Sequence, residues 1–88
     1  GDFDLEEEEK MILRVEEEID KLPKQRREVL KLSVYQGMSY PQIAEVTGLS
    51  VNTVKTHMKK AYQELRKKLY DERQGLFLLF IFSLLRED

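Results

Sequence analysis

The sequence has no cysteine, no tryptophan, two prolines and one histidine among its 88 residues. Without cysteine there is no disulfide framework, no thiolate metal site and no cysteine nucleophile, and small secreted domains usually depend on disulfides. The single histidine, His57, cannot form a histidine-rich metal site, and no charged start followed by an apolar run marks a signal peptide. We therefore expect a protein of the reducing cytoplasm that binds no metal and no cofactor.

The chain also lacks the features of most enzymes. It has no glycine-rich phosphate loop, and its many carboxylates lie in exposed-looking runs rather than as pairs in an apolar setting. We therefore expect no catalytic activity and no catalytic residue. With 41% hydrophobic and 36% charged residues, the chain is too apolar to be disordered and long enough for one small core.

The net charge of −2 conceals an uneven distribution along the chain. Residues 1–20 carry ten acids and two bases, a charge of −8. Residues 21–49 carry a charge of +3, and residues 50–73 carry +4. An acidic start followed by a basic middle predicts a surface that binds a polyanion.

The apolar residues recur every three and four positions, and no window shows the alternation of a strand, so we predict an all-α fold without a wing. Glycine and proline punctuate the helical pattern and set its boundaries. We expect a domain over residues 1–75 and an apolar, helical C-terminal tail over residues 76–88. The four helices expected in the domain are residues 5–20, residues 24–36, a short helix between Ser39 and Gly48, and a long helix from Val51 to about Arg73.

The apolar faces of these helices give the predicted core. Most members lie three or four positions from another member on the same helix. On the second helix, either Val34 or Tyr35 is the last member of the buried apolar face. The other predicted core residues are Leu5, Met11, Ile12, Val15, Ile19, Val29, Leu30, Leu32, Ile43, Ala44, Val46, Val54, Met58, Ala61, Leu65 and Leu69.

Residues 41–60 have the sequence form of a helix-turn-helix. Two helices that cross steeply after a short turn need a small residue at the crossing and a glycine with positive φ in the turn. They also need apolar residues from both helices in one wedge, and serine is a preferred N-cap before each helix. The residues that meet these needs are Ala44, Gly48, Ile43, Leu49, Val54, Ser39 and Ser50.

The outward side of the long helix has the chemistry of a major-groove surface. Lysine donates to guanine edges or phosphates, asparagine and glutamine pair with adenine, and threonine offers a hydroxyl and a methyl group. No acid interrupts this side before Glu64. The alternative to DNA binding is that these residues form an ordinary solvated helix surface. For His57, both packing in the core and contact with a phosphate or base stay open. The predicted DNA-binding residues are Asn52, Thr53, Lys55, Thr56, His57, Lys59, Lys60 and Gln63.

Several short motifs between Leu22 and Leu69 lie at a spacing that resembles a known family. They are Leu22-Pro23, Arg27-Glu28-Val29, Gly37-Met38-Ser39-Tyr40, Ile43-Ala44-Glu45, Gly48-Leu49-Ser50, Thr53-Val54-Lys55, Ala61 and Leu65-Arg66. With these motifs the chain resembles region four of bacterial RNA polymerase sigma factors, in the extracytoplasmic-function group of the sigma-70 family. Region four is the C-terminal promoter-binding domain of these factors.

A second family shares part of this pattern. The segment 50–57 is equally similar to the DNA-binding domain of LuxR-type response regulators. Two features favour the sigma factor: the segment 31–36 is one residue longer than is usual in LuxR-type domains, and the last helix continues past the DNA-facing residues. A helical protein-interaction module without nucleic acid is a third hypothesis.

The resemblance implies that the helix from Val51 lies in the major groove of the minus-35 element while the domain contacts the flap of the polymerase β subunit. Many relatives have arginine where His57 stands, and often where Lys60 stands. Lysine cannot make the two parallel hydrogen bonds to guanine that the planar guanidinium of arginine makes. The DNA sequence that this domain reads therefore stays open. Sigma factors also have a separate domain that melts DNA and are commonly inhibited by an anti-sigma factor, so we expect this chain to be part of a longer protein.

The segment from Leu76 to Leu85 is apolar apart from Ser83. As a helix it would span about 15 Å, half the thickness of the bilayer core, so we expect no membrane insertion. Its apolar side chains are too costly to leave in water. We expect it to be covered either by the same chain or by a partner: a second copy in a homodimer, the missing domain or an anti-sigma factor.

Overall fold

The computed structural model describes residues 5–69, and residues 1–4 and 70–88 lie outside the described part, as do the side chains of Leu5, Glu8 and Met11. Within residues 5–69 the chain is all-α, as predicted, and contains no strand. The predicted tail, the predicted domain boundary and the predicted core positions Leu5 and Met11 are therefore not described. The four helices are α1 (Leu5–Asp20), α2 (Lys24–Val34), α3 (Tyr40–Thr47) and α4 (Val51–Lys68).

The predicted helix ends need two corrections. The chain leaves the helical conformation at Leu69, where ψ is 47°, so α4 ends at Lys68 and not near Arg73. Similarly, α2 ends at Val34 and not at residue 36, because Gly37, with a φ of 65°, reverses the chain and the Met38 N–H donates to the Leu32 carbonyl at 3.1 Å. Gly37 is thus the left-handed residue that the sequence predicted.

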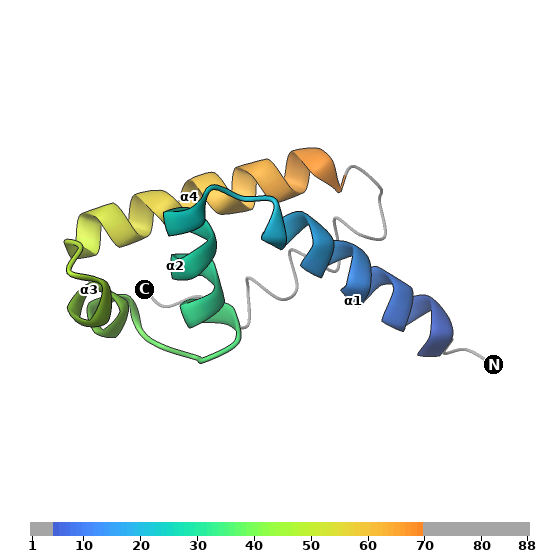
Figure 1. Cartoon of the computed structure of the whole chain (residues 1–88), viewed down its shortest axis with the longest axis horizontal. Helices are drawn as coiled ribbons and strands as arrows, with labels where there is room; N and C mark the ends of the chain where they lie inside the picture. Colours follow the sequence, from blue (N-terminus) through green and yellow to red (C-terminus); the bar gives the residue numbers. More distant parts are fainter. Residues whose placement is uncertain (1–4, 70–88) are drawn as a thin grey trace.

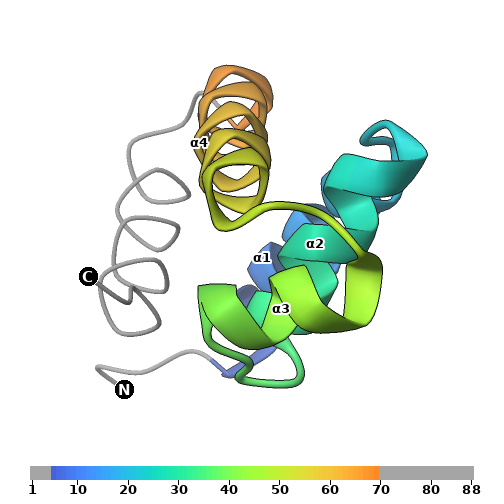
Figure 2. The same ribbon diagram turned by 90° about the vertical axis from the view of Figure 1, so that its left-hand side faces the viewer.

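The helices are arranged around α4 (Figure 1). Helix α2 crosses α4 and packs against its middle. Helix α3 packs against both of them near the N-terminal end of α4. Helix α1 contacts α4 and extends away from the other helices. Figure 2 shows α2 and α3 on one side of α4. None of these described helices is long and apolar enough to cross a membrane.

One hydrophobic core joins the four helices. Five of its members have no exposed surface, and they come from α2, α3 and α4. The partly buried Leu49, from the turn between α3 and α4, packs against this core and completes the wedge expected of a helix-turn-helix. The buried core residues are Val15, Ile19, Leu22, Val29, Leu30, Ile43, Val54, Met58, Ala61, Leu65 and Leu69.

Two predicted core positions are wrong. Ile12 is 44% exposed because the N-terminal half of α1 extends away from the other described helices. Val46 is 61% exposed because α3 turns the side that carries Ile43 towards its neighbours. Of the two alternatives on α2, the half-buried Val34 packs against the core, whereas Tyr35 is exposed.

Serine side chains begin both helices of the helix-turn-helix, as predicted. The Ser39 Oγ accepts a hydrogen bond from the Gln42 N–H at 3.3 Å, and the Gln42 Oε1 accepts one from the Ser39 N–H at 2.8 Å. This reciprocal pair is a capping box. The Ser50 Oγ accepts a hydrogen bond from the Thr53 N–H at 3.0 Å, so the first turn of α4 is fixed at the end of the preceding turn.

The turn between α3 and α4 depends on Gly48. Its φ is 77°, in the left-handed region, and its N–H donates to the Ala44 carbonyl at 2.9 Å. The Thr47 Oγ1 donates to the Ile43 carbonyl at 2.6 Å and accepts a longer bond from the Leu49 N–H at 3.4 Å. These local bonds satisfy backbone groups at the end of α3 and set the direction in which α4 departs.

We expect Val54→Ala to lower the free energy of unfolding by roughly 2–3 kcal/mol, because it removes two buried methyl groups and leaves a cavity at a fully buried position. Val46→Ala is the matched control, since the same change at an exposed helical position should cost almost nothing. Urea unfolding followed by circular dichroism measures both. Equal losses would contradict the assigned orientation of α3 and α4.

We expect Gly48→Ala to cost about 1–2 kcal/mol, because an alanine must adopt the left-handed conformation there. A Cβ at this position would meet no atom within 4 Å, so the cost comes from the backbone and not from a clash. Gly48→Asn should cost less, since asparagine tolerates this conformation better. The same unfolding experiment ranks the variants, and an alanine variant as stable as the parent would refute the role of Gly48.

Candidate nucleic-acid interface

The helix α4 has one buried and one exposed side. Its buried residues are Val54, Met58, Ala61 and Leu65, which confirms the inward side predicted from the sequence. The opposite side is formed by polar residues that face away from α2 and α3. The first turn of α4 is capped by Ser50. The predicted DNA-binding residues that are exposed on this side are Asn52, Lys55, Thr56, Lys59, Lys60 and Gln63. Their role in DNA binding stays a prediction.

The two other predicted DNA-binding residues, Thr53 and His57, are half-buried. The Thr53 Oγ1 accepts a hydrogen bond from the Ser50 hydroxyl at 2.8 Å, so Thr53 contributes to the cap of α4. On the exposed side, the Thr56 hydroxyl donates to the Asn52 carbonyl at 3.0 Å. With this proton engaged, Thr56 offers a ligand its methyl group and an oxygen lone pair.

The charge of α4 is almost entirely positive. Glu64 is its single acid, against six lysines and arginines. Arg26 of α2 forms an ion pair with this acid, and the Arg26 side chain is only 16% exposed. The carboxylate is therefore neutralised within the fold, and the lysines of α4 dominate the potential that a polyanion meets.

His57 lies beside this ion pair. Burial lowers the pKa of its imidazole below the usual 6.5, and the nearby charges of Arg26 and Lys60 lower it further. The ring is therefore neutral at neutral pH. Its Nδ1 is buried and has no hydrogen-bond partner among the described residues, and the same holds for the Nε of Arg26. The sequence left packing and ligand contact open for His57, and the half-buried ring leaves both available.

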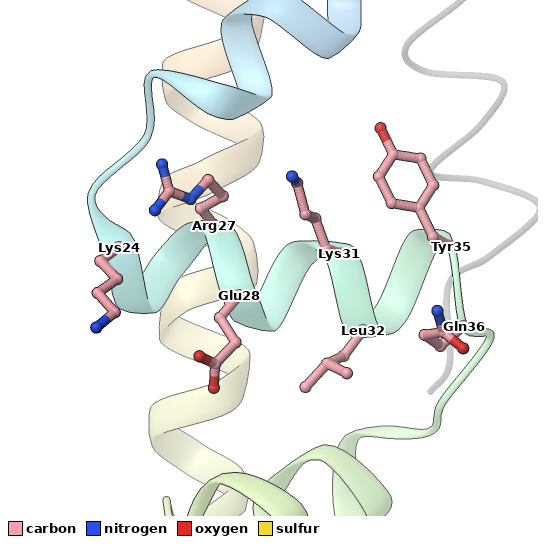
Figure 3. A pocket seen from close by; sticks show the side chains of 7 residues that line it. All are labelled: Lys24, Arg27, Glu28, Lys31, Leu32, Tyr35 and Gln36. Atoms are coloured by element: carbon pink, nitrogen blue, oxygen red, sulfur yellow. The ribbon is translucent and has the colours of Figure 1, made fainter.

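A groove of about 350 Å³ lies on α2 (Figure 3). The sequence analysis did not predict it, although basic residues recur every three or four positions along this side of α2 and could have indicated it. The apolar part consists of the half-buried Leu32 and the exposed Tyr35. The residues that line the groove are Lys24, Arg27, Glu28, Lys31, Leu32, Tyr35 and Gln36.

Two cations of this groove also tie α2 to the end of α1. The Lys31 Nζ lies 2.9 Å from the Asp20 Oδ1, and the Arg27 guanidinium donates to the Asp20 carbonyl at 2.9 Å. The hydrogen bond from Lys31 is the main reason why the pKa of Asp20 lies below its usual value. The groove therefore has a fixed wall where α1 meets α2. Among residues 5–69, no three histidine or acidic side chains are placed to hold a metal ion.

Comparison with known proteins agrees with this architecture. Residues 12–65 match the family described as Sigma-70, region 4. The chain is 38% identical over 58 residues to the RNA polymerase sigma factor YlaC of Bacillus subtilis (strain 168), an alignment that covers 66% of this chain and 34% of that protein. It is also 38% identical over 52 residues to the ECF RNA polymerase sigma factor EcfG of Rhodopseudomonas palustris (strain TIE-1), covering 59% and 29% of the two chains.

The chain thus spans about a third of the length of these curated relatives. No solved structure matches it with significance. The family match covers more than half of the chain and includes α2, α3 and most of α4, so it confirms the sigma-factor family that the sequence favoured over LuxR-type domains. The chain belongs to the sigma-70 region 4 family, the promoter-binding region of bacterial RNA polymerase sigma factors.

Proposed function

We propose that this chain binds the minus-35 element of promoter DNA, as region 4 of an extracytoplasmic-function sigma factor, and directs RNA polymerase to chosen genes in the cytoplasm. The observation that carries the proposal is the exposed side of α4, where three lysines alternate with amide and hydroxyl side chains. The helix begins at a capped turn and is held at an angle to α3, so its N-terminal half is free to enter a major groove.

Each type of side chain on α4 has a distinct part in this proposal. Asn52 and Gln63 can pair with adenine edges, while the Thr56 methyl group suits a thymine methyl. Lys55, Lys59 and Lys60 bind phosphates or guanine edges. The phosphate contacts supply most of the affinity, and the base contacts supply the specificity.

We assign the polymerase contact to the groove on α2. Figure 3 shows α2 in front of α4, so the groove lies on a different side of the domain from the proposed DNA surface. Tyr35 and Leu32 form the apolar part of the groove towards the C-terminal end of α2, and its basic residues lie towards the N-terminal end (Figure 3). This arrangement suits an apolar segment that carries acidic residues on one side. The flap of the polymerase β subunit is the proposed occupant, and an anti-sigma factor would inhibit by covering the same groove. The homodimer expected through Leu76–Leu85 would be formed by residues outside the described part of the chain.

Selection of bound sites from random duplexes tests DNA binding and identifies the sequence that is read. We expect affinity for a selected duplex to fall with salt, with a slope of log K against log salt of about −4 to −5 if roughly five cations neutralise phosphates. Lys59→Gln and Lys60→Gln should each weaken binding about tenfold and reduce the slope by about 1. Fluorescence anisotropy at several salt concentrations measures both quantities.

Lys10→Gln is the matched control, because Lys10 is an exposed lysine of α1 that pairs with Glu6 one turn away on the same helix. It should leave affinity nearly unchanged. If Lys59→Gln and Lys60→Gln behave like this control while the fold is intact, the assigned surface is wrong. If no duplex is bound at any salt concentration, the helical interaction module becomes the better hypothesis.

We expect Tyr35→Ala to weaken binding to polymerase core about tenfold, since an exposed aromatic side chain that lines a groove is a typical anchor of an interface. Tyr35→Phe keeps the ring and should bind almost as well as the parent. Both variants should bind DNA normally. Surface plasmon resonance with immobilised core enzyme measures the first interaction, and unchanged core binding by Tyr35→Ala would remove the groove from consideration.

A further inference from the structure

We propose that the apolar segment Leu76–Leu85, together with the acids that follow it, docks along the groove on α2 of the same chain. The segment lies outside the described part of the chain, and the order of its residues matches that of the groove. The consequence rests on the proposed function: while the segment covers the groove, polymerase cannot bind there.

The groove follows the length of α2. Most of its residues form two rows. In Figure 3, Arg27, Lys31 and Tyr35 point to one side of the helix, and Lys24, Glu28 and Leu32 point to the other. Each row begins with a cation near the N-terminal end of α2 and finishes with an apolar or aromatic side chain towards the C-terminal end. A segment that lies along α2 therefore meets basic groups at one end and an apolar surface at the other.

The apolar part continues onto α1. Burial raises the pKa of Tyr35, and the charges of Glu16 and Asp20 raise it further, so its phenol lies within reach of this side of α1. Ile12 precedes Glu16 by one helical turn on the same side, and its side chain is 44% exposed. Leu32, Tyr35 and Ile12 thus form an apolar strip that the other described residues leave partly exposed.

The segment has the same two parts in the opposite order. Residues 76–85 are apolar apart from Ser83, and Arg86, Glu87 and Asp88 follow. If the segment runs antiparallel to α2, its apolar part covers the apolar strip and its two acids reach the basic end of the groove. The sequence of the segment and the surface of the groove are therefore complementary in both hydrophobicity and charge.

The cations at the basic end can accept these acids. Within residues 5–69 no carboxylate forms a salt bridge with Lys24 or Arg27, whereas Lys31 is paired with Asp20. Glu28 is the single acid among the residues that line the groove, and it suits the one base of the segment, Arg86.

The end of α4 lies close enough for this docking. Helix α4 ends at Lys68, and Leu69 is buried in the core. The six residues 70–75 separate Leu69 from the segment, and when extended they reach about 20 Å. The two shorter dimensions of the molecule are 21 and 17 Å. A linker this short gives the segment a local concentration on the order of millimolar, which favours the groove of its own chain over that of a second copy.

Crosslinking between engineered cysteines tests the docking in the whole chain. The sequence has no cysteine, so Ser83→Cys with Gln36→Cys gives one pair, and Ser83→Cys with Gln63→Cys gives the matched control. Gln36 lines the groove, whereas Gln63 is exposed on α4. A short bismaleimide should join the first pair about tenfold faster than the second, in a product with the mobility of a monomer.

Three outcomes would overturn the docking. Equal rates for the two pairs would mean that the segment does not prefer the groove. A first pair that joins only between two chains, in a product with the mobility of a dimer, would assign the segment to a second copy. The absence of product from both pairs would mean that the segment is covered elsewhere.

A charge exchange tests the antiparallel direction. Lys24→Glu should slow the crosslinking of the groove pair about three- to tenfold, and adding Glu87→Lys should restore part of the rate. Lys10→Glu changes a lysine of α1 that pairs with Glu6, and it should leave the rate unchanged. A loss in Lys24→Glu that Glu87→Lys does not restore would contradict this direction.

Binding to polymerase core tests the consequence. If the segment covers the groove for about nine-tenths of the time, it lowers the affinity for core about tenfold. Phe82→Ser should weaken the docking and recover part of that factor, while affinity for DNA stays the same. Unchanged affinity for core, together with rapid crosslinking to Gln36, would place the polymerase contact elsewhere and leave the docking established. A chain that binds neither core nor DNA would refute the proposed function without altering the crosslinking result.

Discussion

The packing of Ile43 of α3 and Val54 of α4 into one core is the constraint on which the rest of the domain depends. Both side chains are fully buried in the core, and the turn between them is short. The left-handed Gly48 and the cap at Ser50 allow the chain to reverse, since the Gly48 N–H donates to the Ala44 carbonyl and the Ser50 side chain accepts from the Thr53 N–H. Once Val54 faces inward, the helical period turns Thr56, Lys59 and Lys60 outward, so packing of the core and presentation of the binding surface are one event.

Most acidic and most basic residues of this domain lie on different helices. Most of the acids of the first 20 residues lie on α1, which extends away from the N-terminal half of α4. The single acid on α4 is held by Arg26, an arginine that α2 contributes across the core. A chain with a small negative net charge therefore presents a basic surface, because the fold separates its charges in space and the average does not describe any one face.

The domain also separates its two proposed interactions. The exposed side of α4 is polar and carries lysines, whereas the groove on α2 combines an apolar part at its C-terminal end with basic residues towards its N-terminal end. An ion pair from Lys31 and a hydrogen bond from Arg27, both to Asp20, fix one wall of that groove. In the proposed function, these two different surfaces on one small core would let a single domain bind promoter DNA and RNA polymerase at the same time.

Local signals determined much of this protein from the sequence: the four helices, both serine caps, the two glycines with positive φ and the inward side of α4 all depend on residues close together in the chain. Tertiary structure decided what depends on neighbours distant in sequence. Helical period alone placed Ile12 and Val46 in the core, yet no described helix covers them. The pairing of Arg26 with Glu64, the buried edge of His57 and the groove on α2 likewise exist only after the helices pack, because each depends on how segments separated along the chain come to lie together.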